Sequence, residues 1–187
     1  MSGVGHGKSE RLSAKSFLVK VAFVAQLVLL LSVGAASAHY LIPDSVNDES
    51  GEIRWEDYTR YDDACTFAIS QWHRLGGVPI LKDSASTPTD LVFRDFRDCG
   101  TGTVGYWEPK TGPDAINFNS CYMGKLGTQD QRASATHELG HALRFAHPSG
   151  TKESERWRKS SIMYYCSSCV PFNRPQAHDK ADYRGIW

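Results

Sequence analysis

Residues 137–147 read HELGHALRFAH, which places three histidines and one glutamate within eleven positions. On a helix, His137 and His141 are one turn apart, so both imidazoles project from the same face, about 5–6 Å apart. That spacing lets two nitrogens reach one zinc ion at about 2.0–2.1 Å. His147 lies six residues beyond His141, and a straight helix would carry it about 9 Å further along the axis. If His147 binds the same zinc, the chain must leave the helix just after His141.

Glu138 follows the first histidine and therefore turns off the metal axis, near the place of a water molecule. A zinc ion with three protein ligands keeps a fourth position for water and lowers the pKa of that water toward about 7. A nearby carboxylate can take the proton of the water and pass it to a leaving amine. The alternative is a solvent-facing helix whose histidines are coincidental, but the third histidine favours the metal. We predict that His137, His141 and His147 bind one catalytic zinc and that Glu138 is the general base.

The first 38 residues have the features of a secretory signal peptide. Basic residues precede an apolar run that starts at Val21 and is 15 residues long, short of the roughly 20 residues that span a bilayer. Ala36-Ser37-Ala38 closes this run, so we expect cleavage before His39, secretion, and no membrane contact after cleavage. An uncleaved membrane anchor is the alternative. Residues 39–51 would then form a short N-terminal segment and residues 52–187 one catalytic domain, large enough to bury a core.

Composition limits the partners and the cellular compartment. Removing residues 1–38 takes away four Lys or Arg and one Glu, so the formal charge of 0 for the whole chain becomes about −3. No basic patch is left, and nucleic acid is not expected as a partner. In an oxidising compartment we expect two disulfides and one spare thiol from the five cysteines Cys65, Cys99, Cys121, Cys166 and Cys169. The C-x-x-C at 166–169 could be a short bridge, half a zinc site or a redox pair, of which a structural disulfide is favoured.

Hydrophobic periodicity and turn residues predict five strands and three helices. The strands lie near residues 53–58, 78–81, 87–96, 104–109 and 114–120, and Pro109 marks the fourth as an edge strand. The helices are 65–75, which Asp62-Asp63 can cap and Gly76-Gly77 ends; 129–145, capped by Thr128; and 178–187. Residues 151–176 read mostly as loop. This order of elements predicts an α+β domain.

These residues resemble a known family. HELGHALRFAH resembles the H-E-x-x-H-x-x-G-x-x-H signature of the metzincin zinc endopeptidases, and SIMYY, residues 161–165, resembles their Met-turn, with Met163 as the methionine. Small size and the terminal helix are most similar to a matrixin-type catalytic domain. The resemblance implies a mixed, mainly parallel twisted sheet, an active-site helix and a loop-rich C-terminal subdomain ending in a helix. It also implies a peptide substrate bound extended along the edge strand, around Val104 to Glu108.

Two positions bear on the resemblance. Arg144 stands where the family has glycine, as the chain leaves the helix, and a left-handed backbone there costs a residue with a β-carbon roughly 1–2 kcal/mol. Zinc binding could hold such a turn in place. Tyr165 matches the tyrosine of S-x-M-x-Y metzincins, which reaches the zinc or the oxyanion, whereas Tyr164 would match a matrixin-like Met-Tyr pair. The other interpretation is that both tyrosines pack in the core.

The sequence thus predicts a secreted, monomeric, zinc-dependent endopeptidase. The alternative is a secreted zinc-binding module without turnover, and Glu138 favours the enzyme because a metal-holding module needs no base there. Calcium is a further candidate cofactor, although no loop has an EF-hand-like pattern and solvated surface charge explains the same residues. Its candidate ligands are Asp62, Asp63, Asp95 and Asp98.

Overall fold

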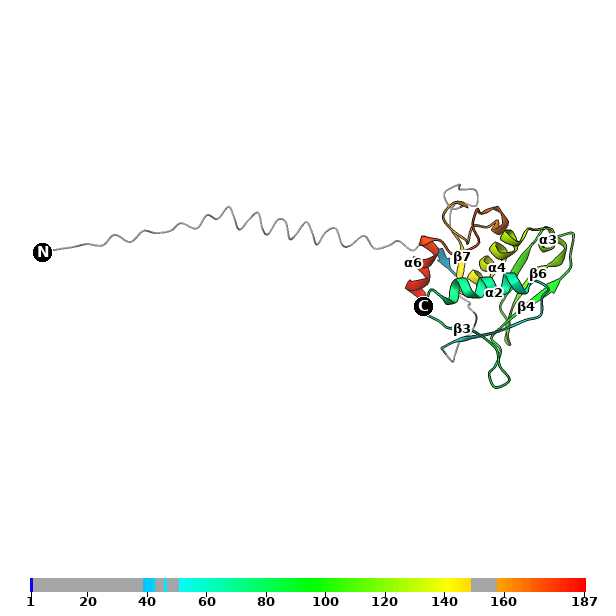
Figure 1. Ribbon diagram of the computed structural model, residues 1–187, viewed down its shortest axis with the longest axis horizontal. Coiled ribbons are helices and arrows are strands. Elements are labelled where there is room, and N and C mark those ends of the chain that lie inside the picture. The colour runs from blue at the N-terminus through cyan, green and yellow to red at the C-terminus, as the bar shows by residue number, and fades with distance from the viewer. Residues whose placement is uncertain (2–38, 43–45, 47–50, 149–157) are drawn as a thin grey trace. The chain divides into compact units, whose positions relative to one another are not determined.

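The computed structural model describes residues 1, 39–42, 46, 51–148 and 158–187 (Figure 1). The chain divides into two units, Met1–Ala36 and Ser37–Trp187, and the expected signal peptide lies outside the described residues. Among the residues that are described, no helix is long and apolar enough to cross a membrane. All the described strands and helices belong to the second unit.

A five-stranded sheet with the strand order β3-β2-β4-β6-β5 forms one layer. Three neighbouring pairs (β3 with β2, β2 with β4, β4 with β6) are parallel, and β5 runs antiparallel to β6 at the edge. This mixed, mainly parallel sheet and its edge strand agree with the prediction, but the second strand starts two residues later than expected and the third strand starts four residues later. The strands are β2 (Ile53–Asp57), β3 (Ile80–Lys82), β4 (Leu91–Phe96), β5 (Gly105–Glu108) and β6 (Asp114–Asn119).

Helices form the second layer, and together with the sheet they make an α+β fold. The described helices are α2 (Asp62–His73), α3 (Ser120–Met123), α4 (Thr128–Ala142) and α6 (Ala177–Ile186), with a 3-10 turn, η1 (Ser167–Cys169). α2 and α4 pack side by side (Figure 1). The long helix α4 ends at Ala142, three residues before the predicted end, so the chain leaves the helix directly after the second histidine.

The predicted helix caps are wrong. Tyr61 is the N-cap of α2 and Gly127 is the N-cap of α4, and neither makes a side-chain capping hydrogen bond. Asp62 and Asp63 instead lie in the first turn of α2, where a carboxylate interacts favourably with the positive end of the helix dipole. Thr128 is the first residue of α4 rather than its cap.

The core joins the helices to one another around Trp72, a fully buried residue of α2. Its ring stacks on Phe145, 5.4 Å between centroids, and lies 5.6 Å from the ring of Tyr183 on α6. Its indole Nε1 donates to the carbonyl of Thr136 on α4, at 2.9 Å. The indole therefore fixes the middle of α4, the helix that carries the first two histidines of the motif.

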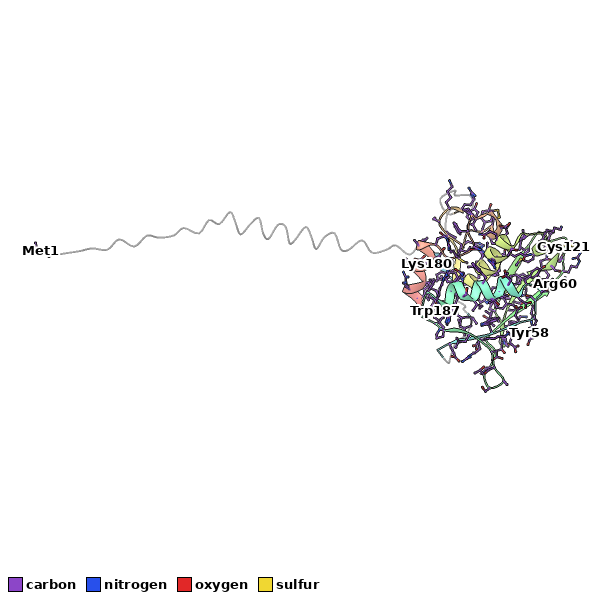
Figure 2. All side chains as sticks on the ribbon, viewed as in Figure 1. Met1, Tyr58, Arg60, Cys121, Lys180 and Trp187 are labelled. Carbon is purple, nitrogen blue, oxygen red and sulfur yellow. A yellow bond between two sulfur atoms is a disulfide. The ribbon has the colours of Figure 1, made fainter. Side chains whose placement is uncertain are left out.

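A two-stranded antiparallel sheet was not predicted. It pairs β1 (His39–Leu41) with β7 (Phe145–Pro148), the strand that carries the third histidine. Two disulfides, Cys99–Cys121 and Cys166–Cys169, and one free buried thiol, Cys65, match the predicted count and the structural role of the C-x-x-C. Cys121 on α3 and Trp187, at the end of α6, are labelled in Figure 2.

Candidate metal centre

Three imidazoles meet where α4 ends and β7 begins. The Nε2 atoms of His137 and His141 lie 3.0 Å apart, and those of His137 and His147 lie 3.1 Å apart. Tetrahedral zinc with Zn–N bonds of about 2.0–2.1 Å would separate neighbouring ligand nitrogens by about 3.3 Å. Within the described part of the chain, this is the only group of three or more His, Cys, Asp or Glu side chains that is close enough together to hold a metal.

Backbone carbonyls orient two of the rings. His137 Nδ1 lies 2.8 Å from the Ile162 carbonyl oxygen, and His141 Nδ1 lies 2.6 Å from that of Phe145. Because a carbonyl can only accept, each Nδ1 carries the proton and donates, which leaves the lone pair on Nε2. The lone pairs of both Nε2 atoms are therefore available to a cation, and with His147 Nε2 beside them this donor set suits zinc.

Burial keeps these rings neutral. It lowers the pKa of His137 well below its ordinary value, and the nearby His141 and His147 lower it further. Burial, with His147 as the second cause, lowers the pKa of His141 to about 4. The hydrogen bonds to the carbonyls oppose both shifts but are weaker. Neutral imidazole is the form that binds metal ions.

Glu138 lies against the edge strand β5. Burial raises the pKa of its carboxyl to about 8, and a hydrogen bond from the backbone amide of Trp107 opposes the rise. A cation at the three Nε2 atoms would lower that pKa. Gly105 permits the close approach, since a β-carbon added there would lie 3.3 Å from Glu138 Cγ. The predicted base is thus enclosed between its own helix and the strand edge.

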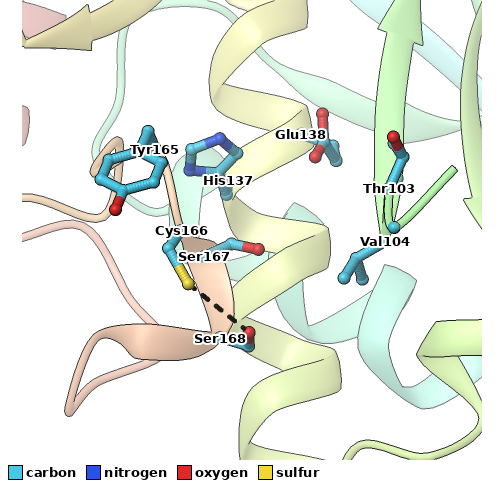
Figure 3. A pocket seen from close by; sticks show the side chains of 10 residues that line it. Thr103, Val104, His137, Glu138, Tyr165, Cys166, Ser167 and Ser168 are labelled. Atoms are coloured by element: carbon cyan, nitrogen blue, oxygen red, sulfur yellow. Dashed lines mark hydrogen bonds between the residues drawn. The ribbon is translucent and has the colours of Figure 1, made fainter. Parts of the chain in front are cut away.

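A cavity of about 340 Å³ opens beside His137 and Glu138 (Figure 3). Residues Gly102 to Gly105 form one wall, and Tyr165 to Ser168 form the other. The Cys166–Cys169 disulfide constrains the second wall, and a 3.0 Å hydrogen bond between the hydroxyls of Ser134 and Ser167 attaches it to α4.

The two tyrosines of the SIMYY stretch differ. Tyr164 is buried, as the core-packing interpretation expects, but Tyr165 is 45% exposed and lines the cavity. Its hydroxyl points away from His137 in Figure 3. A role for Tyr165 at the zinc or the oxyanion stays a prediction.

Met163 is fully buried and packs against Gly140 of α4, the residue before His141. The turn around it is held by Asp179, a completely buried carboxylate of α6 that sequence reasoning missed. Asp179 accepts from the Ser161 hydroxyl at 2.6 Å and from the Ile162 amide at 2.9 Å. Because the Ile162 carbonyl accepts from His137, Asp179 supports the orientation of the first histidine through a single residue, Ile162.

Arg144 has a φ of 80°, the left-handed conformation expected at this position. It is the only non-glycine residue with positive φ in the described ranges, and its backbone costs roughly 1–2 kcal/mol relative to glycine. Its amide donates to the His141 carbonyl at 3.0 Å. The turn therefore folds back tightly from α4 into β7.

The predicted calcium ligands do not come together in the described structure. Asp63 forms a salt bridge with Arg132, at 2.8 Å, and Asp95 forms one with Arg60, at 3.0 Å. The bond to Arg132 also lowers the pKa of Asp63. Asp63 and Asp95 are thus explained by their arginine partners.

Comparisons with known proteins add little. No family model and no curated protein matches the chain. A solved structure described as the GM1 bound form of the ECX AB5 holotoxin is similar at 11% identity with a TM-score of 0.48, over 73% of this chain and 80% of that chain. A likeness at that level carries no argument about function.

Proposed function

We propose that this protein is a secreted, zinc-dependent endopeptidase of the metzincin type. The observation that carries the proposal is the convergence of three imidazole Nε2 atoms beside a buried carboxylate, Glu138, at the wall of a cavity. The HELGHALRFAH and SIMYY stretches support the family, and the two disulfides suit an oxidising compartment.

His137, His141 and His147 would hold the zinc, which when bound supplies a Lewis acid for the attacking water and the scissile carbonyl. Glu138 would take the proton of that water and deliver it to the departing amine. Its contacts with β5 hold the carboxylate in place, so this transfer needs no large movement of the side chain. The carbonyls of Ile162 and Phe145 hold His137 and His141 in the ligand tautomer throughout.

The substrate would be an extended peptide. β5 pairs with β6 along one side, and the Trp107 amide points from its other side toward Glu138. A peptide that adds as a strand to this second side, between Val104 and Glu108, would pass directly in front of the base. The adjacent cavity could take one of its side chains. We expect a monomer that binds neither nucleic acid nor, after signal cleavage, a membrane.

Hydrolysis of an unstructured protein such as casein tests the proposal. Glu138→Gln keeps the shape of the side chain and all three histidines, so zinc content should be unchanged while the rate falls about 10²–10⁴-fold. Glu56→Gln is a matched control, because β2 is separated from the edge strand β5 by two other strands. A chelator should abolish hydrolysis and added zinc should restore it.

Equal rates for Glu138→Gln and the original protein at equal zinc loading would refute the assigned base. No hydrolysis by the original protein would point instead to the zinc-binding module.

A further inference from the structure

The turn from Ala142 to Phe145 decides whether the third histidine reaches the metal. α4 stops at Ala142, Arg144 takes the left-handed conformation, and β7 starts at Phe145. Were this turn to relax toward a continued helix, His147 would move several Å away from His137 and His141. The third ligand therefore depends on what holds the turn.

All four carbonyls of the turn accept a hydrogen bond. The Phe145 carbonyl accepts from the ring of His141 itself, at 2.6 Å. The other three accept from segments distant in the sequence: Ala142 from the Val46 amide at 2.8 Å, Leu143 from the Trp187 indole at 3.4 Å, and Arg144 from the Ile42 amide at 3.0 Å. Carbonyls at the end of a helix lack partners within the helix, so these three distant donors satisfy them.

Ile42 and Arg144 are bonded in both directions. Besides the amide bond from Ile42, the Arg144 Nε donates to the Ile42 carbonyl at 3.4 Å. The pairing of β1 with β7 continues the contact, with Leu41 opposite Phe145 and His39 opposite Pro148. The strained residue and the strand that carries His147 are thus joined to the same N-terminal segment.

We propose that the backbone amides of Ile42 and Val46, with the indole of Trp187, form a brace that holds His147 in position for the metal. Arginine in place of glycine at position 144 makes the turn dependent on the brace, because the left-handed backbone is unfavourable for a residue with a β-carbon. Ile42, Val46 and Trp187 are positioning residues, since they touch neither metal nor substrate. The inference rests on the proposed metal centre but not on protease activity.

Titration of the full chain with cobalt(II), whose visible absorption reports the ligand set, tests the brace. Ile42→Pro removes one amide donor. A backbone hydrogen bond is worth a factor of about 2–12, so we expect roughly tenfold weaker binding, with the three-histidine spectrum reached only at higher cobalt concentration. Ile42→Ala, the matched control, keeps the amide and should bind within about threefold of the original protein.

A rescue experiment distinguishes a positioning role of the brace from a general effect on the stability of the fold. Adding Arg144→Gly to Ile42→Pro makes the left-handed turn inexpensive without the brace, so binding should return to within about threefold. If the Ile42→Pro variant does not fold, Trp187→Phe is the second test, because it keeps an aromatic ring and removes the indole donor. It should weaken cobalt binding two- to fivefold, and Arg144→Gly should again reverse this loss. Unchanged affinity in the Ile42→Pro and Trp187→Phe variants, or weakening that glycine does not relieve, overturns the brace.

Failure of the proposed function gives a different result. If the original protein binds neither cobalt nor zinc, the metal centre is refuted, and the brace is then judged by hydrogen exchange. The Ile42 and Val46 amides should exchange slowly in the original protein, and deletion of residues 39–42 should make the Val46 amide exchange fast. Fast exchange of these amides in the original protein would overturn the brace.

Discussion

Gly140 and Gly185 both lie inside helices, and the same substitution at each should have opposite effects. In an open helical position, Gly→Ala stabilises by about 1 kcal/mol, because alanine loses less backbone entropy. Gly185 on α6 is such a position, since nothing lies within 4 Å of an added β-carbon. Gly185→Ala should therefore raise the free energy of unfolding by about that amount.

At Gly140 the added β-carbon meets the buried side chain of Met163. It would overlap the Met163 sulfur, lie 3.0 Å from Met163 Cε and lie 3.2 Å from Trp72 Cζ2. Both side chains are fully buried, so moving either one disturbs the core around it. Overpacking of this kind costs typically 1–3 kcal/mol, and three close contacts favour the upper half of that range. After subtraction of the helix preference of alanine, Gly140→Ala should lower the free energy of unfolding by about 1–2 kcal/mol.

Urea unfolding followed by circular dichroism, with disulfides intact, measures both variants. The double variant Gly140→Ala/Met163→Ala should lose less than the sum of its parts, because the new methyl fills part of the space that the methionine leaves. If Gly140→Ala is as stable as Gly185→Ala, or the double variant is strictly additive, the packing of Met163 against α4 is not as described.

His147→Ala removes a ligand and should weaken zinc binding by about 100-fold or more, given that even indirect supports of a metal ligand are worth 10–100-fold; full zinc content after dialysis against a weak chelator would contradict this. Asp179→Asn keeps the size of a buried side chain that accepts three hydrogen bonds and should cost about 2–3 kcal/mol in urea unfolding, so unchanged stability would remove its role in the Met163 turn. Cys65 allows a test by pH. Burial raises the pKa of its thiol above the ordinary value, so the thiol ionises at a lower pH in the unfolded chain than in the folded one. Its contribution to stability is therefore full below about pH 8.5 and declines above that. Between pH 9 and 10 the original protein should lose about 1 kcal/mol more than Cys65→Ala, and parallel pH profiles would show that this thiol does not titrate as described.

Local patterns were sufficient for much of the fold and most of the site. Helical spacing in HELGHALRFAH placed His137 and His141 on one face, and the offset of His147 required the helix to end early, which it does at Ala142. The five strands of the sheet follow from short apolar runs between turn residues, which do not depend on distant partners.

The remaining features depend on contacts between segments far apart in the sequence. Strand β1 has three residues, too few to show periodicity, and forms only because β7 lies beside it. Asp179 reads as an ordinary acidic residue in the first turn of a helix, and nothing local shows that its carboxylate is buried under the Met163 turn. The left-handed backbone of Arg144 was predictable, but its bonds to Ile42 were not, because they cross 102 positions.

The disulfide between Cys99 and Cys121 bridges a sequence separation of 22 residues, and both β5 and β6 lie within the enclosed segment. Exposed loops flank β5 in this segment, at residues 100–103 and 109–113. Such loops are where proteases cut most readily. A molecule cut once in either loop would keep both pieces covalently joined, with the edge strand still tethered to the domain. On a denaturing gel it would migrate as a single chain until a reducing agent separated the two fragments.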